Sequence, residues 1–406
     1  MRTWFCLVVL AACSSSDPAK PDAELPQPDA AGPLALGPLM PQAIALDASA
    51  VMATPTVMPI TFDVDTNRGD IETFFPQYAA SSAWADQTAM YGVGPLTIAT
   101  PQHVSTAPVT TDAMAEALIR TNTSGATPAW GAASASTLYS IFIPESTTFD
   151  DGTGDLCCQD YDGYHDDFMV GGVDVAYAIH CVCPNFPPPG VTALQELTTT
   201  AGHETVEAAT DPHFETDEAF DDVDAAHEAW TYVTGGELAD LCEYADTAYW
   251  TDAPGMTYTI QRTWSNAAAA AGMDPCVAGA PATYVQGVPE QPDSAVIAPY
   301  GVDVTTTSLK VAKNATGTLT VHLAGTGQGP FTVKAFDIGT EFGASSPYLT
   351  FVQPTGTYNV GDTVTISVTV KASDPGLGSS AGAEAFEIDT VPASGPTTYY
   401  WGLVSQ

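Results

Sequence analysis

The sequence predicts a mixed α+β domain followed by an all-β sandwich. From residue 58 onward, apolar strand-like runs alternate with patterns of helical period, which is typical of an α+β domain. In the C-terminal part, short segments of alternating polar and apolar residues are separated by Gly, Pro and Asp turns, which is typical of an antiparallel sandwich. The composition changes near residues 288–292, so we place the boundary between the two domains there.

The first residues have the pattern of a bacterial secretory signal. Arg2 precedes an apolar run, residues 4–10, that is too short to span a bilayer. Residues 10–13, LAAC, resemble the lipobox of bacterial lipoproteins, in which the cysteine becomes the acylated first residue. We therefore expect residues 1–13 to be a lipoprotein signal peptide with the lipid attached at Cys13. The protein would then be exported and anchored by lipid at the outer membrane or the cell surface.

The next segment predicts a tether and the start of the folded part. Residues 14–57 are rich in Pro, Ala and Asp and show no periodicity, so we expect them to be disordered. A strand is expected at residues 58–62. A helical pattern follows, and four aromatic or aliphatic residues would form its buried face: Ile71, Phe74, Phe75 and Tyr78.

Two further elements precede a cysteine-rich region. Asp112 is expected to be the N-cap of a helix that runs through Ile119. The apolar run 138–143 predicts a strand, either buried or at a sheet edge, and Pro144 ends it. Residues 150–185 then predict a loop-heavy stretch.

That stretch is interrupted by a strand at residues 173–180 and followed by the longest helix of the chain. Thr192 begins this helix. It ends at Asp211, because Pro212 cannot continue it.

Beyond residue 292, about seven alternating segments predict an immunoglobulin-like β-sandwich. Residues 318–323 and 363–370 show the alternation most clearly. No cysteine falls in this part, so packing alone must hold it together, and we expect it to fold by itself without carrying chemistry. The α+β domain accordingly takes residues 58–287 and the sandwich residues 293–406.

The charge of the chain excludes some partners. It has 9 Lys and Arg against 48 Asp and Glu, a formal net charge of -39. Such a chain is repelled by the phosphates of nucleic acid and by anionic lipid head groups. We therefore expect no nucleic-acid partner, and contact with a membrane only through the lipid anchor.

Cysteines outside the signal and the anchor number six: Cys157, Cys158, Cys181, Cys183, Cys242 and Cys276. An even number in an exported chain predicts three disulfides. A zinc site made by the first four is the alternative, but adjacent cysteines and a Cys-x-Cys pair fit the usual ligand spacing poorly.

The long helix carries His203, Glu204 and Glu207 in an HExxE string. Residues four apart share a helix face, so His203 and Glu207 can bind one ion with Glu204 beside it. HExxH zinc peptidases use this arrangement with a histidine in place of Glu207. A catalytic zinc needs three protein ligands and an open position for water, whose proton Glu204 would take as general base. The alternative is an ordinary surface helix, because the string recurs by chance.

Several segments resemble the exordium, or phosphate-induced, protein family and its bacterial secreted relatives. The relatives read HExxEAxTDP, AW, EIxDxC, WSN and C, in the order found here at residues 203–212, 229–230, 237–242, 264–266 and 276. Upstream, residues 161–165 resemble their CGYH element and residues 175–178 their YA strand, although Asp162 stands where they often have cysteine. The HExxE helix within this resemblance leads us to expect a zincin-like domain, in which the strand 138–143 forms the edge that pairs with an extended substrate.

The third metal ligand is expected to be Glu237, which follows the turn Gly235-Gly236 and resembles the downstream glutamate of gluzincins. Three alternatives remain open: Asp240, Asp211 and His213. Cys242 and Cys276 flank the WSN segment, and we expect them to pair and to hold the Glu237 turn near the helix.

The sequence thus predicts a zinc-dependent metallopeptidase of the cell surface that acts on an extracellular protein or peptide. Calcium is a second candidate ion, although the loop that begins at Asp160 has Gly171 where a calcium loop needs glutamate. No Gly-x-Ser-x-Gly string is present, so a serine hydrolase is not indicated. The alternative function is a non-catalytic surface binding or adhesion protein, in which the HExxE helix is structural or holds an ion without hydrolysis.

Overall fold

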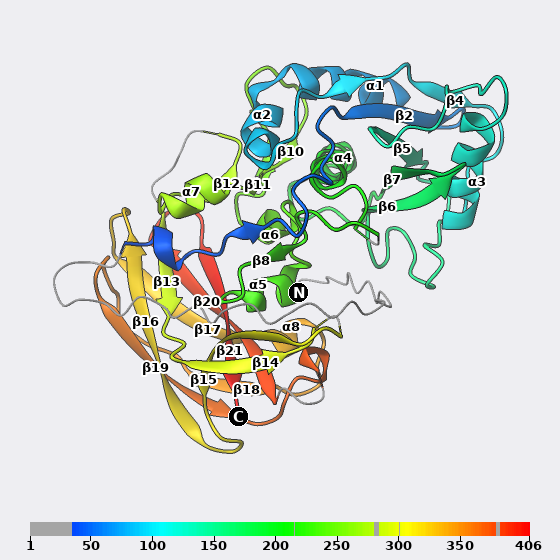
Figure 1. Ribbon diagram of the computed structural model, residues 1–406. Coiled ribbons are helices and arrows are strands. Elements are labelled where there is room, and N and C mark those ends of the chain that lie inside the picture. Colours follow the sequence, from blue (N-terminus) through cyan, green and yellow to red (C-terminus); the bar gives the residue numbers. More distant parts are fainter. Residues whose placement is uncertain (1–34, 215, 280–283, 300, 379–381) are drawn as a thin grey trace.

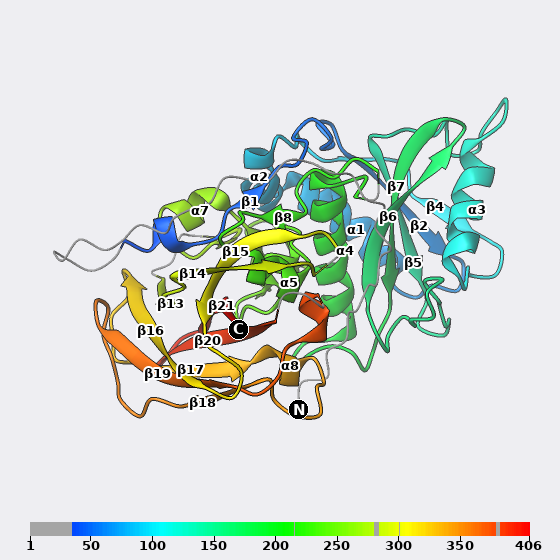
Figure 2. The same cartoon turned by 60° about the horizontal axis from the view of Figure 1, so that its bottom comes forward.

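The computed structural model describes residues 35–406 except 215, 280–283, 300 and 379–381. The predicted signal peptide and Cys13 lie outside the described residues. Figures 1 and 2 show an α+β part, built on a six-stranded sheet, beside a β-sandwich made by the C-terminal part of the chain. The prediction of an α+β part followed by a β-sandwich is confirmed, whereas the zincin-like and immunoglobulin-like types stay predictions. No helix among the described residues is long and apolar enough to cross a membrane.

The sheet of the α+β part is mostly parallel. Its order is β3 (Thr97–Ile98), β2 (Thr56–Phe62), β5 (Thr137–Ile143), β7 (Val173–Cys181) and β6 (Gly163–Val170), and β4 (Gln102–Val104) also pairs with β2. β2, β5 and β7 run parallel, whereas β6 runs antiparallel to β7 and forms one edge. β2 and β5 are largely apolar and almost fully buried, as strands covered on both faces must be.

The prediction that the strand 138–143 is the substrate-pairing edge was wrong. β5 lies between β2 and β7 in the strand order. Because it has a neighbour on each side, six of its seven residues are buried. The edge strand is β6, which falls in the stretch predicted as loop. Its polar residues hide the strand pattern, since His165 and Asp167 occupy buried positions.

Four helices pack on the two faces of the sheet. They are α1 (Arg68–Ala80), α2 (Ser82–Thr88), α3 (Asp112–Thr123) and α4 (Ala193–Thr210). α1, α2 and α4 share one hydrophobic cluster with the sheet, and α3 packs on the opposite face. The four residues predicted for the buried face of α1 are all buried.

The predicted ends of the long helix are confirmed. Thr192 and Gln195 form a capping box at the start of α4, and Asp211 is the C-cap before Pro212. α3 differs slightly from the prediction, because its N-cap is Thr111, whose side chain accepts a hydrogen bond from the Met114 N–H.

The predicted tether extends too far. Within it lie the 3-10 helix η1 (Gly37–Leu39) and β1 (Ala43–Ile44), and β1 pairs with β8 (Asp222–Val223). Leu36, Met40 and Met52 are buried. Part of the predicted tether therefore belongs to the core, whereas residues 45–49 are exposed. Scattered apolar side chains without periodicity can still pack against other elements.

Short elements connect α4 to the sandwich. They are α5 (Glu228–Thr234), α6 (Asp240–Glu243), β9 (Tyr249–Trp250), β10 (Ile260–Gln261), β11 (Thr263–Trp264), α7 (Asn266–Ala270) and β12 (Cys276–Val277). A further 3-10 helix, η2 (Ala89–Tyr91), follows α2. The Tyr91 hydroxyl donates to the Trp264 carbonyl at 3.0 Å, and the Asn266 amide binds the backbone of Ala43. The predicted WSN segment thus fastens the N-terminal segment.

Two sheets form the sandwich. One contains β13 (Val285–Pro289), β16 (Thr316–Gly325), β19 (Thr363–Val370) and β18 (Leu349–Val352). The other contains β14 (Asp293–Ile297), β15 (Val304–Lys310), β21 (Thr398–Ser405), β20 (Ala383–Pro392) and β17 (Phe331–Asp337), with α8 (Ile338–Glu341) and the 3-10 helix η3 (Pro375–Leu377) at its margins. Alternating residues of both sheets meet in a common apolar core.

The boundary between the two parts differs from the prediction. β13 pairs with β16 over five residues, so the sandwich begins at Val285 rather than at residue 293. The parts also share a hydrophobic core, in which the Trp230 ring of α5 lies 4.6 Å from the ring of Trp401 in β21. The expectation that residues 293–406 fold by themselves therefore loses its basis, because that fragment lacks β13 and exposes the shared face.

Three disulfides connect the six expected cysteines. Cys242 pairs with Cys276, as predicted. The pairing left open is Cys157 with Cys181 and Cys158 with Cys183, which fastens the loop before β6 to the end of β7.

Candidate metal centre

The HExxE face of α4 lies against the edge strand β6. Gly163 at the start of β6 allows this contact, because a Cβ there would lie 2.4 Å from the Thr200 methyl group and 3.2 Å from Glu204 Oε1. Its backbone φ is not in the left-handed region, so the requirement for glycine comes from the close approach alone. The contact brings His165, two residues further along β6, over the HExxE residues.

We use the name acidic centre for eight side chains that gather around this contact. Two are imidazoles and six are carboxylates: His165, His203, Glu204, Glu207, Asp211, Asp221, Glu237 and Asp240. They come from β6, from α4 and from the chain between α4 and α6.

One ring nitrogen of His203 lies close to two carboxylates. Its Nε2 lies 2.9 Å from Glu207 Oε2 and 3.2 Å from Asp240 Oδ1. Burial alone would lower the pKa of His203, but the carboxylates of Glu207 and Glu204 raise this pKa well above its ordinary value. The site is therefore built to hold positive charge at this nitrogen.

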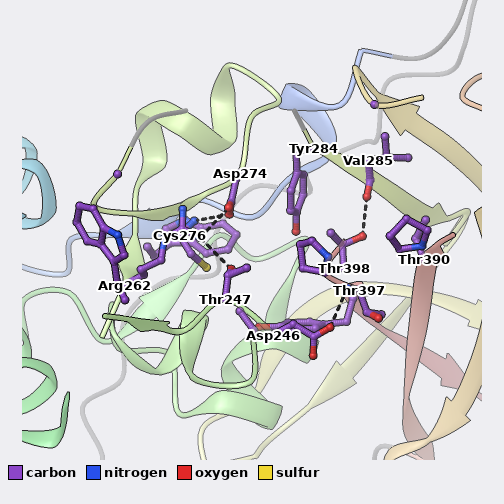
Figure 3. Close-up of a pocket in the computed structure, with 18 of the residues that line it drawn as sticks. Asp246, Thr247, Arg262, Asp274, Cys276, Tyr284, Val285, Thr390, Thr397 and Thr398 are labelled. Atoms are coloured by element: carbon purple, nitrogen blue, oxygen red, sulfur yellow. Dashed lines mark hydrogen bonds and ion pairs between the residues drawn. The ribbon is translucent and has the colours of Figure 1, made fainter. Parts of the chain in front are cut away.

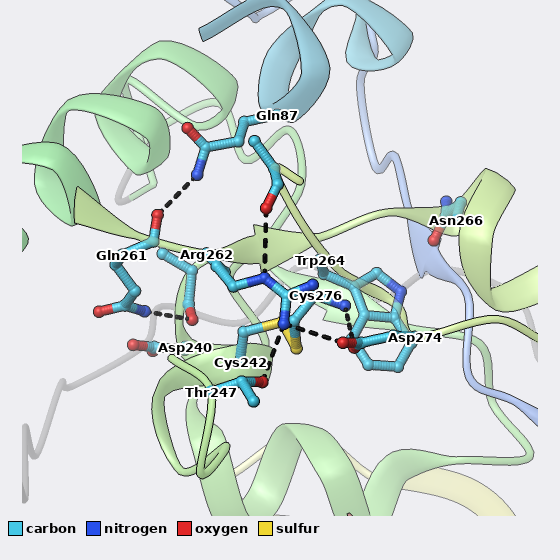
Figure 4. The surroundings of a disulfide bond; sticks show 12 residues. Gln87, Asp240, Cys242, Thr247, Gln261, Arg262, Trp264, Asn266, Asp274 and Cys276 are labelled. Atoms are coloured by element: carbon cyan, nitrogen blue, oxygen red, sulfur yellow. Dashed lines mark hydrogen bonds and ion pairs between the residues drawn. A yellow bond between two sulfur atoms is a disulfide. The ribbon is translucent and has the colours of Figure 1, made fainter. Parts of the chain in front are cut away.

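The other ring nitrogen of His203 is fixed by Gln261. The Gln261 side-chain amide donates from Nε2 to the Ala239 carbonyl at 2.7 Å, which directs its Oε1 towards His203 Nδ1 at 3.0 Å. Gln87 in turn donates to the Gln261 carbonyl at 2.7 Å (Figure 4). Because Oε1 can only accept, Nδ1 carries a hydrogen, and Nε2 is the nitrogen that can take a proton or a cation between the carboxylates.

Glu207 lies between the two imidazoles. Its Oε1 accepts hydrogen bonds from the backbone N–H groups of Ala239 and Asp240 at 3.2 and 3.1 Å. Its Oε2 lies 2.9 Å from His203 Nε2 and 3.8 Å from His165 Nδ1. One oxygen thus anchors the side chain, and the other faces the centre.

His165 also faces carboxylates on both sides of its ring. Its Nδ1 lies 3.5 Å from Glu204 Oε2, and its Nε2 lies 3.3 Å from Glu237 Oε1 and 3.1 Å from the Asp211 carbonyl. In the sequence, His165 belongs only to a resemblance and is not predicted as a ligand. The polar residues at alternate positions, His165 and Asp167, lie at buried positions of β6, which the sequence alone does not reveal.

The predicted ligands divide between two groups. Among the described residues, His203, Glu204 and Glu207 have ligand atoms within 4.8 Å of one another, and so do His165, Glu207 and Glu237. Glu237 is thus brought together with Glu207, but through His165 rather than His203.

The alternatives for the third ligand occupy different places. Asp240 faces His203, and Asp211 groups with Asp221 and Glu237. His213 lies in a separate group with Asp167 and Asp174, outside the acidic centre.

The acidic centre has a surplus of buried negative charge. Burial raises the pKa of Glu204 to about 8, that of Glu207 to about 7 and that of Asp211 to about 6. Burial, reinforced by neighbouring carboxylates, raises the pKa values of Glu237 and Asp221 well above the ordinary range. No Lys or Arg among the described residues forms an ion pair with these side chains. Protons or metal ions must therefore supply the missing positive charge.

A second acidic pair lies nearer the start of α4. The Thr200 hydroxyl donates to Asp162 at 2.5 Å, and the Tyr249 hydroxyl donates to Glu196 at 2.8 Å. Burial, followed by the charge of Asp162, raises the pKa of Glu196 to about 8. Glu196 is on the same helix as the HExxE string but in none of the candidate metal groups, which makes it a suitable control position.

A cavity of about 610 Å³ lies between the α+β part and the sandwich (Figure 3). Aromatic side chains line much of it, including Trp230, Trp250 and Tyr284. The one basic side chain among its described lining residues, Arg262, already binds Asp274 at 2.8 Å and the Thr247 hydroxyl at 2.8 Å. The cavity is separate from the acidic centre, none of whose eight side chains lines it.

Comparisons with known proteins do not extend this picture. No family model and no curated protein matches the sequence. A solved structure of domains 4 and 5 of the S-layer protein SbsC is similar at 16% identity, over 26% of this chain and 58% of that chain, with a TM-score of 0.17. A chimeric titin Z1Z2 carrying a KLER peptide from decorin is similar at 14% identity, over 30% of this chain and 95% of that chain, with a TM-score of 0.16. Similarity at this level carries no argument, so the resemblance to the exordium family stays a prediction.

Proposed function

We propose that this protein is a zinc-dependent peptidase whose metal ion is bound by His203, Glu207 and Asp240, with Glu204 as general base. The observation that carries the proposal is the approach of Glu207 Oε2 and Asp240 Oδ1 to one nitrogen of His203, at 2.9 and 3.2 Å. Two carboxylates beside an imidazole fixed in the correct tautomer resemble the ligand set of a catalytic zinc ion. Asp240 takes the role that the sequence analysis gave to Glu237.

The donor set favours zinc over calcium. An imidazole nitrogen is an ordinary ligand for zinc, whereas calcium takes oxygen ligands almost exclusively. The surplus of buried carboxylates also requires a cation, and the hydrogen bond from His203 Nδ1 to Gln261 leaves Nε2 available for one. When bound, such an ion polarises a peptide carbonyl and lowers the pKa of a water molecule.

Glu204 is positioned to take the proton of that water. It follows His203 directly in the chain, it is buried, and its Oε2 lies 3.5 Å from His165 Nδ1. Burial raises its pKa to about 8 without an ion, and a cation bound beside it would favour the ionised carboxylate that accepts the proton.

The edge strand β6 supplies a binding surface for an extended peptide. β6 pairs with β7 on one side, and its other side is the end of the sheet among the described residues. It also lies directly above the HExxE residues through the Gly163 contact. A substrate strand that pairs with β6 would therefore pass beside Glu204 and His203.

We also propose that the reaction takes place outside the cytoplasm, on an extracellular protein or peptide. Three disulfides are in agreement with an oxidising compartment. The lipobox at Cys13 supports attachment to the outer membrane or the cell surface by lipid.

The test is zinc content and cleavage of an unstructured protein, measured for wild type and two variants. Glu204→Gln should keep the zinc, because the ligands remain, and should lower cleavage at least about 100-fold, because the base is lost. His203→Ala should lose cleavage together with the zinc ion that this histidine binds. The control is Glu196→Gln, which should retain both.

Wild type that binds no metal when purified without chelator, and that cleaves nothing when zinc is supplied, would overturn the proposal. Metal binding without cleavage, unchanged in Glu204→Gln, would instead support the non-catalytic surface protein.

A further inference from the structure

The acidic centre contains more ligands than one zinc ion can use. His203, Glu207 and Asp240 account for the ion proposed above. Four residues remain, in the two further groups that include Glu237: His165, Glu237, Asp211 and Asp221. Glu207 belongs to the groups on both sides.

We propose that the acidic centre holds two divalent cations, with Glu207 as the shared ligand and the second cation bound by His165 and Glu237, whose ligand atoms lie within 4.8 Å of each other and of Glu207. This inference rests on the proposed function, because it uses the same Glu207 carboxylate. The second cation is of the zinc class, since its donors are one imidazole and several carboxylates.

Glu207 is held between the two imidazoles of the acidic centre. Its Oε2 faces His203 Nε2 at 2.9 Å and His165 Nδ1 at 3.8 Å. The backbone N–H groups of Ala239 and Asp240 hold its Oε1, so the carboxylate cannot turn away without losing two hydrogen bonds. A fixed carboxylate between two imidazoles has the position of a bridging ligand, and bridged metal pairs are about 3.5–4 Å apart.

Two buried carboxylate oxygens of the acidic centre lack hydrogen-bond partners among the described residues. Asp211 is fully buried, and its Oδ2 has no hydrogen-bond partner among the described residues, although its Oδ1 accepts from the Ala219 N–H at 2.8 Å. Glu237 Oε1 likewise lacks a hydrogen bond within the described part of the chain. These two side chains have ligand atoms within 4.8 Å of each other. The buried Asp211 oxygen without a partner, beside the Glu237 carboxylate, is costly unless a proton or a nearby cation offsets the charge.

The neighbours of His165 are those expected around a metal-binding histidine. A metal-binding histidine usually donates its other ring N–H to a carbonyl or carboxylate. Glu237 Oε1 lies 3.3 Å from Nε2, so a cation that Glu237 shares binds at this nitrogen. Nδ1 then faces the Glu204 carboxylate at 3.5 Å, which is the kind of partner that supports a metal-binding histidine.

A network of ion pairs without a second metal is the competing explanation. In it, a protonated His165 would face Glu204, Glu207 and Glu237. That explanation also requires protons on several of the surrounding carboxylates, because no Lys or Arg of the described residues pairs with them. A divalent cation provides more of the missing charge than a proton on the imidazole does.

The experiment is a zinc titration of the metal-free full chain, followed by measurement of bound zinc per chain. Wild type and the control Glu196→Gln should bind two zinc ions. His165→Ala and Glu237→Gln should bind one, as should His203→Ala, since each removes a ligand of one ion. A cobalt-loaded wild type should show magnetic coupling between two ions, which needs no variant and so does not depend on whether a variant folds.

Each other outcome separates this inference from the proposed function. One zinc in wild type that His203→Ala removes and His165→Ala retains overturns the second site and leaves the peptidase proposal standing. One zinc that both variants remove also overturns it, because both imidazoles would then bind the same ion. No zinc in wild type overturns both proposals.

Discussion

Single side chains far apart in the sequence decide the chemistry of the acidic centre. His203 is useful as a ligand only because Gln261, 58 positions later in the chain, receives the hydrogen of its Nδ1. Gln261 is itself held by Ala239 and by Gln87, whose Oε1 accepts from the Tyr78 hydroxyl at 2.6 Å. This buried chain of hydrogen bonds positions the imidazole before any metal binds.

Replacing Gln261 tests this role. Gln261→Leu removes the acceptor of His203 Nδ1, so the imidazole can rotate or change tautomer, and zinc affinity should fall about 10–100-fold. Zinc affinity is measured by competition with a chromogenic chelator. The control Gln77→Leu changes a glutamine of α1 outside the acidic centre and should leave the affinity unchanged. An unaltered affinity in Gln261→Leu would show that the amide does not orient the histidine.

The close contact at Gly163 gives a second prediction at the scale of single residues. In Gly163→Ala the new methyl group would lie 2.4 Å from the Thr200 methyl and 2.9 Å from the Ile179 carbonyl, so β6 must move off α4. We expect the free energy of unfolding to fall by about 1–3 kcal/mol and zinc binding to weaken through the displaced His165.

The matched control is Gly69→Ala, because nothing lies within 4 Å of a Cβ at that helical position. It should be neutral or should stabilise by up to about 1 kcal/mol. Equal stabilities of the two variants in urea unfolding would contradict the steric argument.

At the scale of elements, the position of a strand in its sheet mattered more than its composition. β5 has the stronger strand pattern, yet its burial places it in the centre, where no substrate can pair with it. β6 has a weak pattern because it carries polar residues towards α4. The candidate substrate edge is consequently β6, a strand that the pattern of the sequence does not predict.

β20 of the sandwich provides a prediction on pH. Glu384 in this strand is fully buried, its Oε1 accepts from the Gln406 side chain at 2.8 Å, and its Oε2 has no hydrogen-bond partner among the described residues. Burial raises its pKa from 4.5 to about 8 in the folded protein, in spite of the Gln406 hydrogen bond. Between pH 4.5 and pH 8 the folded state therefore binds more protons than the unfolded state, and this contribution to stability is lost as the pH rises.

Glu384→Gln should remove this dependence, because the amide stays neutral. The difference in unfolding free energy between variant and wild type, from urea unfolding at several pH values, should move in favour of the variant as the pH rises from 5 to 8. Glu341→Gln, at an exposed position of α8, should follow wild type at every pH. A difference for Glu384→Gln that does not change with pH would contradict the raised pKa.

At the scale of the whole molecule, the α+β part and the sandwich behave as one folding unit. Trp230 of α5 packs against Trp264 at 5.4 Å and against Tyr400 and Trp401 of β21 at 5.6 and 4.6 Å between ring centroids. Because this cluster is buried between the parts, each part would expose apolar surface without the other.

Trp230→Ala tests this coupling. The variant leaves a cavity in the shared core, so the free energy of unfolding should fall by about 3–5 kcal/mol. Calorimetry should show the single transition of wild type separating into two, since the parts lose their main common contact. The control Val352→Ala, at a position that is 70% exposed, should change little. A variant that unfolds in one transition near the wild-type temperature would show that the parts are held together elsewhere.

The sequence by itself determined the features that depend on neighbouring residues. The capping box at Thr192 and the proline at 212 defined α4, since helix ends are local hydrogen-bond and steric events. The HExxE spacing placed His203 and Glu207 on one face for the same reason. Alternation defined the sandwich, and cysteine count the number of disulfides.

Only the tertiary structure decided the features that depend on residues distant in the chain. Which carboxylate faces His203, the addition of His165, and the place of β5 in the sheet all follow from how α4, β6 and the segment around Asp240 pack together. The burial of Leu36, Met40 and Met52 has the same origin, because these side chains pack in hydrophobic clusters with residues of α4, α7 and the sandwich. Such contacts arise from the sum of many weak packing interactions over the whole chain, and no local pattern records them.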